Sequence, residues 1–319
     1  MASGGAVFSI PMALPFRGIT VREGMLLRGD AGWGEFSPFL EYDEVVSAPW
    51  LACALEAADE GWPEPLRTLI PVNVTVPACD PERAHAIVTR SSGCRTAKVK
   101  VAEKGQTLAE DLARVEAVRD AIGADGRIRI DVNGGWSRED AVSWIPLLDK
   151  ASGGLEYVEQ PCADVEDLAW VRRKVDVPIA ADESIRRAED PYRVRHLEAA
   201  DIAVLKVQPL GGVRACLRIA EDIGLPVVVS SAVETSVGIA AGVALAAALP
   251  RLDHACGLAT MQLLTGDVTA DSLLPVDGNL SVRPVEVDPS LLTAYSASEE
   301  RMAHWRERLK AVRRRQEEG

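Results

Sequence analysis

The chain has 319 residues, 47% of them hydrophobic and 26% charged, and a formal net charge of −13. This length can hold a barrel of roughly 250 residues together with a smaller module. The acidic charge argues against a nucleic-acid partner, since phosphate backbones bind to basic patches. The sequence contains no run of about 18 apolar residues, so we expect no membrane partner. The N-terminus lacks a signal-peptide pattern, so we expect a cytoplasmic location.

The first part of the chain is typical of a small α+β domain. Three short runs rich in strand-forming residues are followed by a Gly-Asp-Ala-Gly turn signal and then by helical periodicity. The strands are expected at 9–14, 20–24 and 25–28, and the helix at 44–60 with an interruption near Pro49. We predict a first domain over residues 1–71.

From Val72 onward, short aliphatic runs alternate with amphipathic stretches. Eight strands are expected, at 72–76, 97–101, 128–132, 155–159, 179–181, 202–206, 227–230 and, more weakly, 255–258. Helices are expected between them at 108–122, 138–148, 165–174, 213–223 and 237–249. This alternation predicts an α/β fold with a parallel barrel over residues 72–280. The remaining segment, 281–319, carries a charged helix at 298–315 that we expect to pack on the first domain.

Ionisable side chains recur where these strands end. They are Lys100, Asp131, Glu159, Asp182 and Lys206, separated by 31, 28, 23 and 24 residues. Each step is about one β/α unit of a barrel of this size. Because the carboxyl ends of barrel strands form one rim, and active sites of such barrels lie on that rim, these five side chains are expected to converge there.

Three of them, Asp131, Glu159 and Asp182, are carboxylates on successive strands. A single acidic residue at a strand end is more often a helix cap, but that explanation would have to apply at three consecutive strands. Converging carboxylates repel each other unless a cation lies among them. A ligand set made only of oxygen atoms suits a hard ion, so we predict a Mg²⁺ site in which Mn²⁺ could substitute.

The lysines are informative because the chain uses few of them. Only seven of its 35 basic residues are lysine, and three of these are Lys98, Lys100 and Lys206. Strand alternation places Lys98 and Lys100 on one face, where the charge of Lys98 would lower the pKa of Lys100. With a lysine on either side of a divalent cation, the site suits removal of a proton next to a carboxylate, which gives an enediolate. Arg129, on the next strand, could either contact substrate or pair with a carboxylate inside the barrel.

These residues resemble those of the enolase superfamily. Lys98-Val99-Lys100 is similar to the K-x-K motif of its muconate lactonizing enzyme subgroup, whose metal ligands correspond to Asp131, Glu159 and Asp182 and whose second lysine corresponds to Lys206. The resemblance implies a modified (β/α)7β barrel with an N-terminal capping domain that the C-terminal segment completes. It also implies a small-molecule carboxylate substrate. We expect a monomer or a small homo-oligomer.

Within this subgroup the chain most resembles the o-succinylbenzoate synthase family of menaquinone biosynthesis. The resemblance lies in the cap segment 32–38, in Arg129, and in Ser230 and Ser231 of the strand-7 loop. It implies a syn dehydration, with Lys100 as base and then acid and Lys206 stabilising the enediolate. The loop 16–19, which contains Gly18, is interpreted as a lid over the substrate. An N-succinylamino acid racemase or a dipeptide epimerase is the alternative, although residues 257–260 lack the Asp-x-Asp that is usual in dipeptide epimerases.

Overall fold

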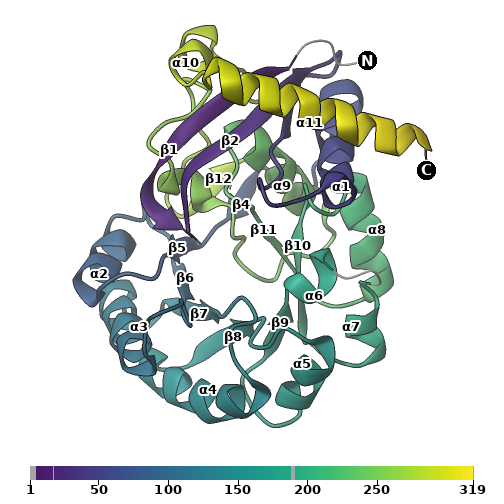
Figure 1. Ribbon diagram of the computed structural model, residues 1–319. Helices are drawn as coiled ribbons and strands as arrows, with labels where there is room; N and C mark the ends of the chain where they lie inside the picture. The colour runs from purple at the N-terminus through teal and green to yellow at the C-terminus, as the bar shows by residue number, and fades with distance from the viewer. Residues whose placement is uncertain (1–4, 17, 188–190, 319) are drawn as a thin grey trace.

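The chain folds into a barrel of parallel strands surrounded by helices, with a smaller antiparallel sheet and two long helices over one end (Figure 1). The computed structural model describes residues 5–16, 18–187 and 191–318. The predicted fold class is confirmed: an α/β barrel carries an α+β cap. In these described residues, no helix has both the length and the apolar character that a membrane span requires.

The cap sheet has the order β1-β2-β3, with β1 (Ala6–Phe16), β2 (Ile19–Arg28) and β3 (Trp33–Phe36) all antiparallel. The prediction of two separate strands at 20–24 and 25–28 was wrong. Gly24 does not end the strand. It lies within β2 where a Cβ would come 2.5 Å from Ser37 Cβ, so close packing, and not a turn, explains the glycine. The strand β3 was not predicted at all.

The first helix, α1 (Glu44–Leu55), is capped by Asp43, whose side chain accepts a hydrogen bond from Val46 N. It continues as a π-helical turn over Glu56–Glu60. It runs through Pro49, where we expected an interruption. The apolar side that includes Trp50 and Leu51 is buried, and this packing outweighs the hydrogen bond that proline cannot donate.

The barrel sheet has the order β5-β6-β7-β8-β9-β10-β11, and all its pairings are parallel. Its strands are β5 (Val74–Val76), β6 (Thr96–Lys100), β7 (Arg127–Asp131), β8 (Leu155–Glu159), β9 (Ile179–Ala181), β10 (Ile202–Lys206) and β11 (Val227–Ser230). The weak eighth strand is reduced to two parallel bridges, Val72–Cys256 and Ser230–Gly257. These bridges join the two edges of the sheet and close the barrel.

Eight helices surround the barrel in the described part of the chain. They are α2 (Pro81–Thr89), α3 (Leu108–Ile122), α4 (Arg138–Ser152), α5 (Val165–Arg172), α6 (Glu183–Arg186), α7 (Arg193–His196), α8 (Val213–Ile223) and α9 (Ser236–Ala248). Of these, α3, α4, α5, α8 and α9 lie at the predicted places, while α2, α6 and α7 were not predicted. Thr107 and Glu110 form a capping box at the start of α3, and Ser137 caps α4. Gly153 and Gly224 end α4 and α8 in the left-handed conformation that favours glycine.

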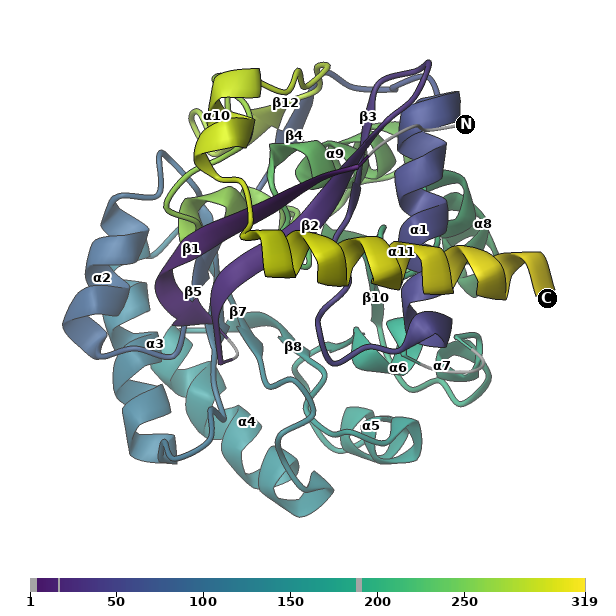
Figure 2. The same cartoon turned by 45° about the horizontal axis from the view of Figure 1, so that its top comes forward.

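The C-terminal segment returns to the cap. Strand β12 (Asn279–Ser281) pairs with β4 (Leu69–Pro71), and helices α10 (Pro289–Ala294) and α11 (Glu299–Glu318) follow. Figure 2 shows α11 lying across β2 and α1. Trp305 of α11 is fully buried edge-on against Phe36 of β3, with 6.0 Å between ring centroids. The domain limits at residues 71 and 280 stay predictions.

Candidate active site

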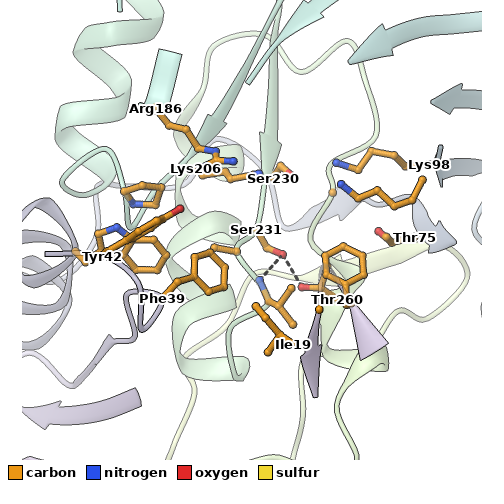
Figure 3. A pocket seen from close by; sticks show the side chains of 18 of the residues that line it. Ile19, Phe39, Tyr42, Thr75, Lys98, Arg186, Lys206, Ser230, Ser231 and Thr260 are labelled. Carbon is orange, nitrogen blue, oxygen red and sulfur yellow. Dashed lines mark hydrogen bonds between the residues drawn. The ribbon is translucent and has the colours of Figure 1, made fainter. Parts of the chain in front are cut away.

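A cavity of about 330 Å³ lies between the cap and the carboxyl ends of the barrel strands. The cap contributes a mainly aromatic and apolar wall that also includes Glu41, and the barrel contributes cationic and hydroxyl side chains (Figure 3). The cap side includes Phe16, Gly18, Ile19, Phe39, Tyr42 and Trp50, and the barrel side includes Thr75, Lys98, Lys100, Arg186, Lys206, Ser230, Ser231 and Thr260. The size and the mixed lining are typical of a small-molecule site.

The predicted rim of ionisable residues is present. Lys100 of β6 is in register with Asp131 of β7, and Asp131 is in register with Glu159 of β8. Glu159 is in register with Ala180, two residues before Asp182. The three carboxylates are fully buried and the lysines are 6–7% exposed. The parallel register therefore places Lys100, Asp131 and Glu159 at one level, with Asp182 two residues further along, and we call these strand-end residues the charged layer.

Each carboxylate of the layer contacts lysine. Lys98 Nζ lies between two of them, 3.2 Å from Glu159 Oε2 and 3.3 Å from Asp131 Oδ2. Lys100 Nζ is 2.5 Å from Asp131 Oδ2 and 2.6 Å from Asn133 Oδ1, and it lies over the ring of Phe16 at 5.3 Å. The ammonium groups thus separate the carboxylates from the cavity.

The third carboxylate is held from two sides. Lys206 Nζ is 2.6 Å from Asp182 Oδ2, and Arg186 Nε donates to Asp182 Oδ1 at 2.8 Å. Arg186 also contacts Glu183 Oε1 at 2.5 Å. Figure 3 shows Arg186 and Lys206 on one side of the cavity, with Lys98 on the other. Cationic groups therefore face the cavity from two opposite walls.

The charges of this layer shift one another's pKa values. Burial and the neighbouring Asp131 raise the pKa of Glu159 to about 7. Burial also disfavours the charged forms of Asp131 and Asp182. The neighbouring lysines nevertheless lower the pKa of Asp131, and Arg186 and Lys206 lower the pKa of Asp182. Burial would lower the pKa of Lys98, yet Glu159 and Asp131 raise it. Glu159 is thus the carboxylate whose negative charge is least compensated.

The donor set fits a hard divalent ion by its chemistry: it has three buried carboxylates at the carboxyl ends of adjacent strands, and the charge of one of them is poorly compensated. The same carboxylates are not drawn together around a common point. Within residues 5–16, 18–187 and 191–318, no three His, Cys, Asp or Glu side chains form a ready-made metal-binding group. The carboxylates are kept apart by ion pairs, because Lys98 Nζ lies between Asp131 and Glu159.

The structure separates the predicted substrate-binding residues into two groups. Lys98, Ser230, Ser231 and Gly18 line the cavity, while Arg17, in the predicted lid, lies outside the described residues. Arg129 is fully buried within the barrel, where it donates to Glu156 Oε2 at 2.9 and 2.6 Å, to Tyr157 Oη at 2.8 Å and to Ala255 O at 2.9 Å. These contacts correct the substrate-binding assignment of Arg129 and favour its interior ion pair.

Several cavity residues were not predicted. Arg186 could have been found, because it lies one helical turn after Asp182, and residues four apart share a helix face. Thr260 contacts Ser231 through a 2.5 Å hydrogen bond between the two hydroxyls, and no local pattern marks it. The aromatic residues Phe39, Tyr42 and Trp50 reach the cavity only through the packing of the cap on the barrel.

Comparisons with known proteins agree with this architecture. Residues 7–58 match a family described as enolase N-terminal domain-like, and residues 82–286 match one described as enolase C-terminal domain-like. Among solved structures, muconate lactonizing enzyme from Pseudomonas fluorescens has a TM-score of 0.79 at 21% identity, covering 92% of this chain and 98% of that one. A dipeptide epimerase from Enterococcus faecalis, complexed with Mg and a dipeptide, has a TM-score of 0.75 at 22% identity. The match covers 89% of this chain and 97% of that one. These two structures support the fold.

Curated relatives are much more similar. The o-succinylbenzoate synthase of Thermobifida fusca is 65% identical over 309 residues, which cover 97% of this chain and 96% of the relative. The o-succinylbenzoate synthase of Mycolicibacterium smegmatis is 55% identical over 303 residues, which cover 95% of this chain and 93% of the relative. With identity at this level over nearly the full length of both proteins, the chain belongs to the o-succinylbenzoate synthase family of the enolase superfamily.

Proposed function

We propose that this chain is a Mg²⁺-dependent o-succinylbenzoate synthase. The reaction is the syn dehydration of 2-succinyl-6-hydroxy-2,4-cyclohexadiene-1-carboxylate to 2-succinylbenzoate in menaquinone biosynthesis. The observation that carries the proposal is the 65% identity to the Thermobifida fusca o-succinylbenzoate synthase over 97% of this chain. The cavity agrees with a substrate that bears two carboxylates, since lysines and an arginine line it on opposite walls.

Lys100 is proposed as the group that moves the proton. Its Nζ lines the cavity and contacts Asp131 and Asn133 through hydrogen bonds that hold it in place. In its neutral form it would take the proton from the carbon next to the ring carboxylate. The same nitrogen would then return that proton to the departing hydroxyl, which leaves as water. One nitrogen can do both because a syn elimination keeps the proton and the hydroxyl on one face of the ring.

Lys206 is proposed to stabilise negative charge without transferring a proton. Its Nζ is fixed by Asp182 at 2.6 Å on the wall opposite Lys98. A fixed cation there would favour the enediolate electrostatically. Lys98, held by Glu159 and Asp131, would add positive charge on the other side.

Asp131, Glu159 and Asp182 are the residues that would hold the metal. Bound there, Mg²⁺ would supply positive charge that stabilises the ionised substrate carboxylate as its α-carbon loses a proton. The raised pKa of Glu159 supports this assignment, because a cation would compensate the charge that burial and Asp131 disfavour. Mn²⁺ is proposed as a substitute. A cytoplasmic location and a monomeric or small homo-oligomeric state remain predictions from the sequence.

One assay separates the synthase from the racemase and epimerase alternative. Purified protein with Mg²⁺ would be given the cyclohexadiene acid, and the aromatic product would be followed by ultraviolet absorbance. N-succinyl amino acids and dipeptides would be incubated in D₂O with the same protein, and α-proton exchange followed by NMR. We expect aromatic product. Absence of that product together with α-proton exchange would overturn the synthase proposal.

A further inference from the structure

A buried polar network joins the cap to the loop between β11 and α9. On the cap side it contains Arg22 of β2, Glu35 of β3 and Ser37, which are 0–3% exposed. On the barrel side it reaches the segment 231–235, of which Ser231, Ala232 and Val233 line the cavity. The network therefore connects two domains at the wall of the candidate active site.

Glu35 caps the barrel helix α9 from the cap. Its Oε2 accepts hydrogen bonds from Thr235 N at 3.1 Å, Thr235 Oγ1 at 2.5 Å and Gly238 N at 3.1 Å. These donors belong to the N-cap and first turn of α9, where backbone N–H groups lack helical partners and a negative charge is favoured. The start of α9, and with it the end of the cavity loop, is thus fixed by a carboxylate from another domain.

Arg22 fixes the same loop two residues earlier. Its Nε donates to Val233 O at 2.9 Å, and one of its terminal nitrogens donates to Ser37 Oγ at 3.0 Å. Ser37 Oγ donates in turn to Glu35 Oε1 at 2.6 Å, so the two charged residues are linked through one hydroxyl. The Arg22 guanidinium also lies over the ring of Phe39, another cavity residue, at 4.8 Å.

The residue that Arg22 holds has a strained backbone. Val233 has φ of 63°, in the left-handed region that a β-branched side chain rarely adopts. Such a conformation persists only where the surroundings determine it, and it is common at ligand sites. The hydrogen bond from Arg22 to Val233 O and the capped helix that follows hold this conformation from outside the loop. Within the loop, Ala232 N donates to Glu234 Oε2 at 2.8 Å and Val233 N donates to Ser231 Oγ at 3.4 Å.

We infer that Arg22 and Glu35 are positioning residues that hold the strained 231–235 loop in the conformation that forms the substrate-binding wall. The inference rests on the proposed function for the identity of the substrate. The reacting lysines are held by other groups, because Lys100 pairs with Asp131 and Lys206 pairs with Asp182. Loss of Arg22 or Glu35 is therefore expected to affect substrate binding more than the chemical step.

The first test compares Glu35→Gln and Arg22→Met with Glu23→Gln. Glu23 is a matched control on the same strand as Arg22, and its carboxylate pairs with Arg301 of α11 on the far side of the cap. We expect both variants of the network to raise KM about tenfold or more, as loss of a charge-assisted hydrogen bond predicts, and to change kcat by less than about threefold. Glu23→Gln is expected to leave KM unchanged. If the two residues only stabilised the fold, their variants would have a lower melting temperature and a lower kcat per total protein, but a native KM. That result would overturn the inference.

The second test uses the strain at Val233. Glycine adopts the left-handed conformation freely, so Arg22→Met should raise KM less in a Val233→Gly background than in the native one. Equal effects in the two backgrounds would mean that Arg22 does not act through Val233.

The third test needs no substrate and remains decisive if the proposed reaction is not observed. Hydrogen–deuterium exchange of the peptides that cover 231–238 is expected to become faster in Glu35→Gln and to stay native in Glu23→Gln. Unchanged exchange in Glu35→Gln overturns the inference whatever the wild type turns over. Failure of the wild type to form the aromatic product overturns the proposed function alone.

Discussion

Lys206 Nζ lies 2.6 Å from Asp182 Oδ2, and Lys206 lies across the cavity from Lys98 (Figure 3). On that opposite side Lys100 makes the corresponding contact with Asp131 at 2.5 Å. Two lysines on β6 and β10 thus lie against carboxylates that we propose as metal ligands. Their contacts are similar, but the proposed roles differ: Lys100 transfers a proton and Lys206 only stabilises charge. Substitution of each lysine by arginine can separate these roles.

Arginine keeps the positive charge of lysine but does not lose a proton in proteins. Lys100→Arg is therefore expected to lower kcat by about a thousandfold, within the range that a positioned acid–base group supplies. Lys206→Arg is expected to retain a clearly higher rate, because its role requires only charge. Product absorbance measures both variants, and circular dichroism checks that each is folded. A Lys100→Arg rate within tenfold of wild type would mean that another group is the base.

The second prediction concerns the metal ligands. Glu159→Gln is expected to weaken Mg²⁺ binding, because it removes the carboxylate whose charge is least compensated. Isothermal titration with Mg²⁺ gives the affinity directly, and the Mg²⁺ dependence of the rate gives it again. Removal of metal by EDTA should abolish turnover, and added Mg²⁺ should restore it.

The matched control for this prediction is Glu156→Gln. It makes the same substitution on the same strand, but the Glu156 side chain pairs with Arg129 and His254 inside the barrel. Its Mg²⁺ affinity should remain native. If both variants bind Mg²⁺ as the wild type does, Glu159 is not a ligand.

The rim residues were predictable because barrel geometry converts sequence spacing into position. Any residue that ends a parallel strand lies on one rim, so Asp131, Glu159 and Asp182 could be placed together from their spacing alone. Strand alternation likewise predicted that Lys98 and Lys100 share a face, and both line the cavity. Resemblance was needed for the substrate, because the spacing carries no information about it.

The cap side of the site could not be predicted in this way. Phe39, Tyr42 and Trp50 reach the cavity through contacts between segments far apart in the chain, and no local periodicity encodes them. The same holds for Arg22 and Val233, which are 211 residues apart. The division of β2 into two predicted strands at Gly24 was wrong, because the glycine is explained by its close packing against Ser37 and Phe8.

The third prediction is a pH dependence of stability at the ion pair inside the barrel. Although burial raises the pKa of Glu156, hydrogen bonds and charges from His254 and Arg129 bring it to about 2, below the ordinary value of 4.5. A carboxyl group with a lowered folded-state pKa stabilises the fold above its unfolded-state pKa, and this stabilisation is lost as the pH falls. The shift corresponds to about 3 kcal/mol.

Urea unfolding of wild type and Glu156→Gln measures this contribution. The wild type should be the more stable protein at pH 7, and its advantage should decrease between pH 4.5 and 2 as Glu156 becomes protonated in the unfolded and then in the folded protein. A difference in free energy of unfolding that does not vary with pH over this window would contradict the prediction.

The fourth prediction concerns the hydroxyl pair of Ser231 and Thr260, whose oxygens are 2.5 Å apart at the cavity wall. Two hydroxyls have two protons, and their mutual hydrogen bond uses one, so the other can be donated to an acceptor in the cavity. A substrate carboxylate is such an acceptor. Ser231→Ala and Thr260→Val should each raise KM by about tenfold, the value of one hydrogen bond to a charged group, with kcat nearly unchanged. Thr265→Val, which removes an exposed hydroxyl bonded to Pro11 O, is the control. A native KM in both cavity variants would show that the hydroxyl pair does not bind the substrate.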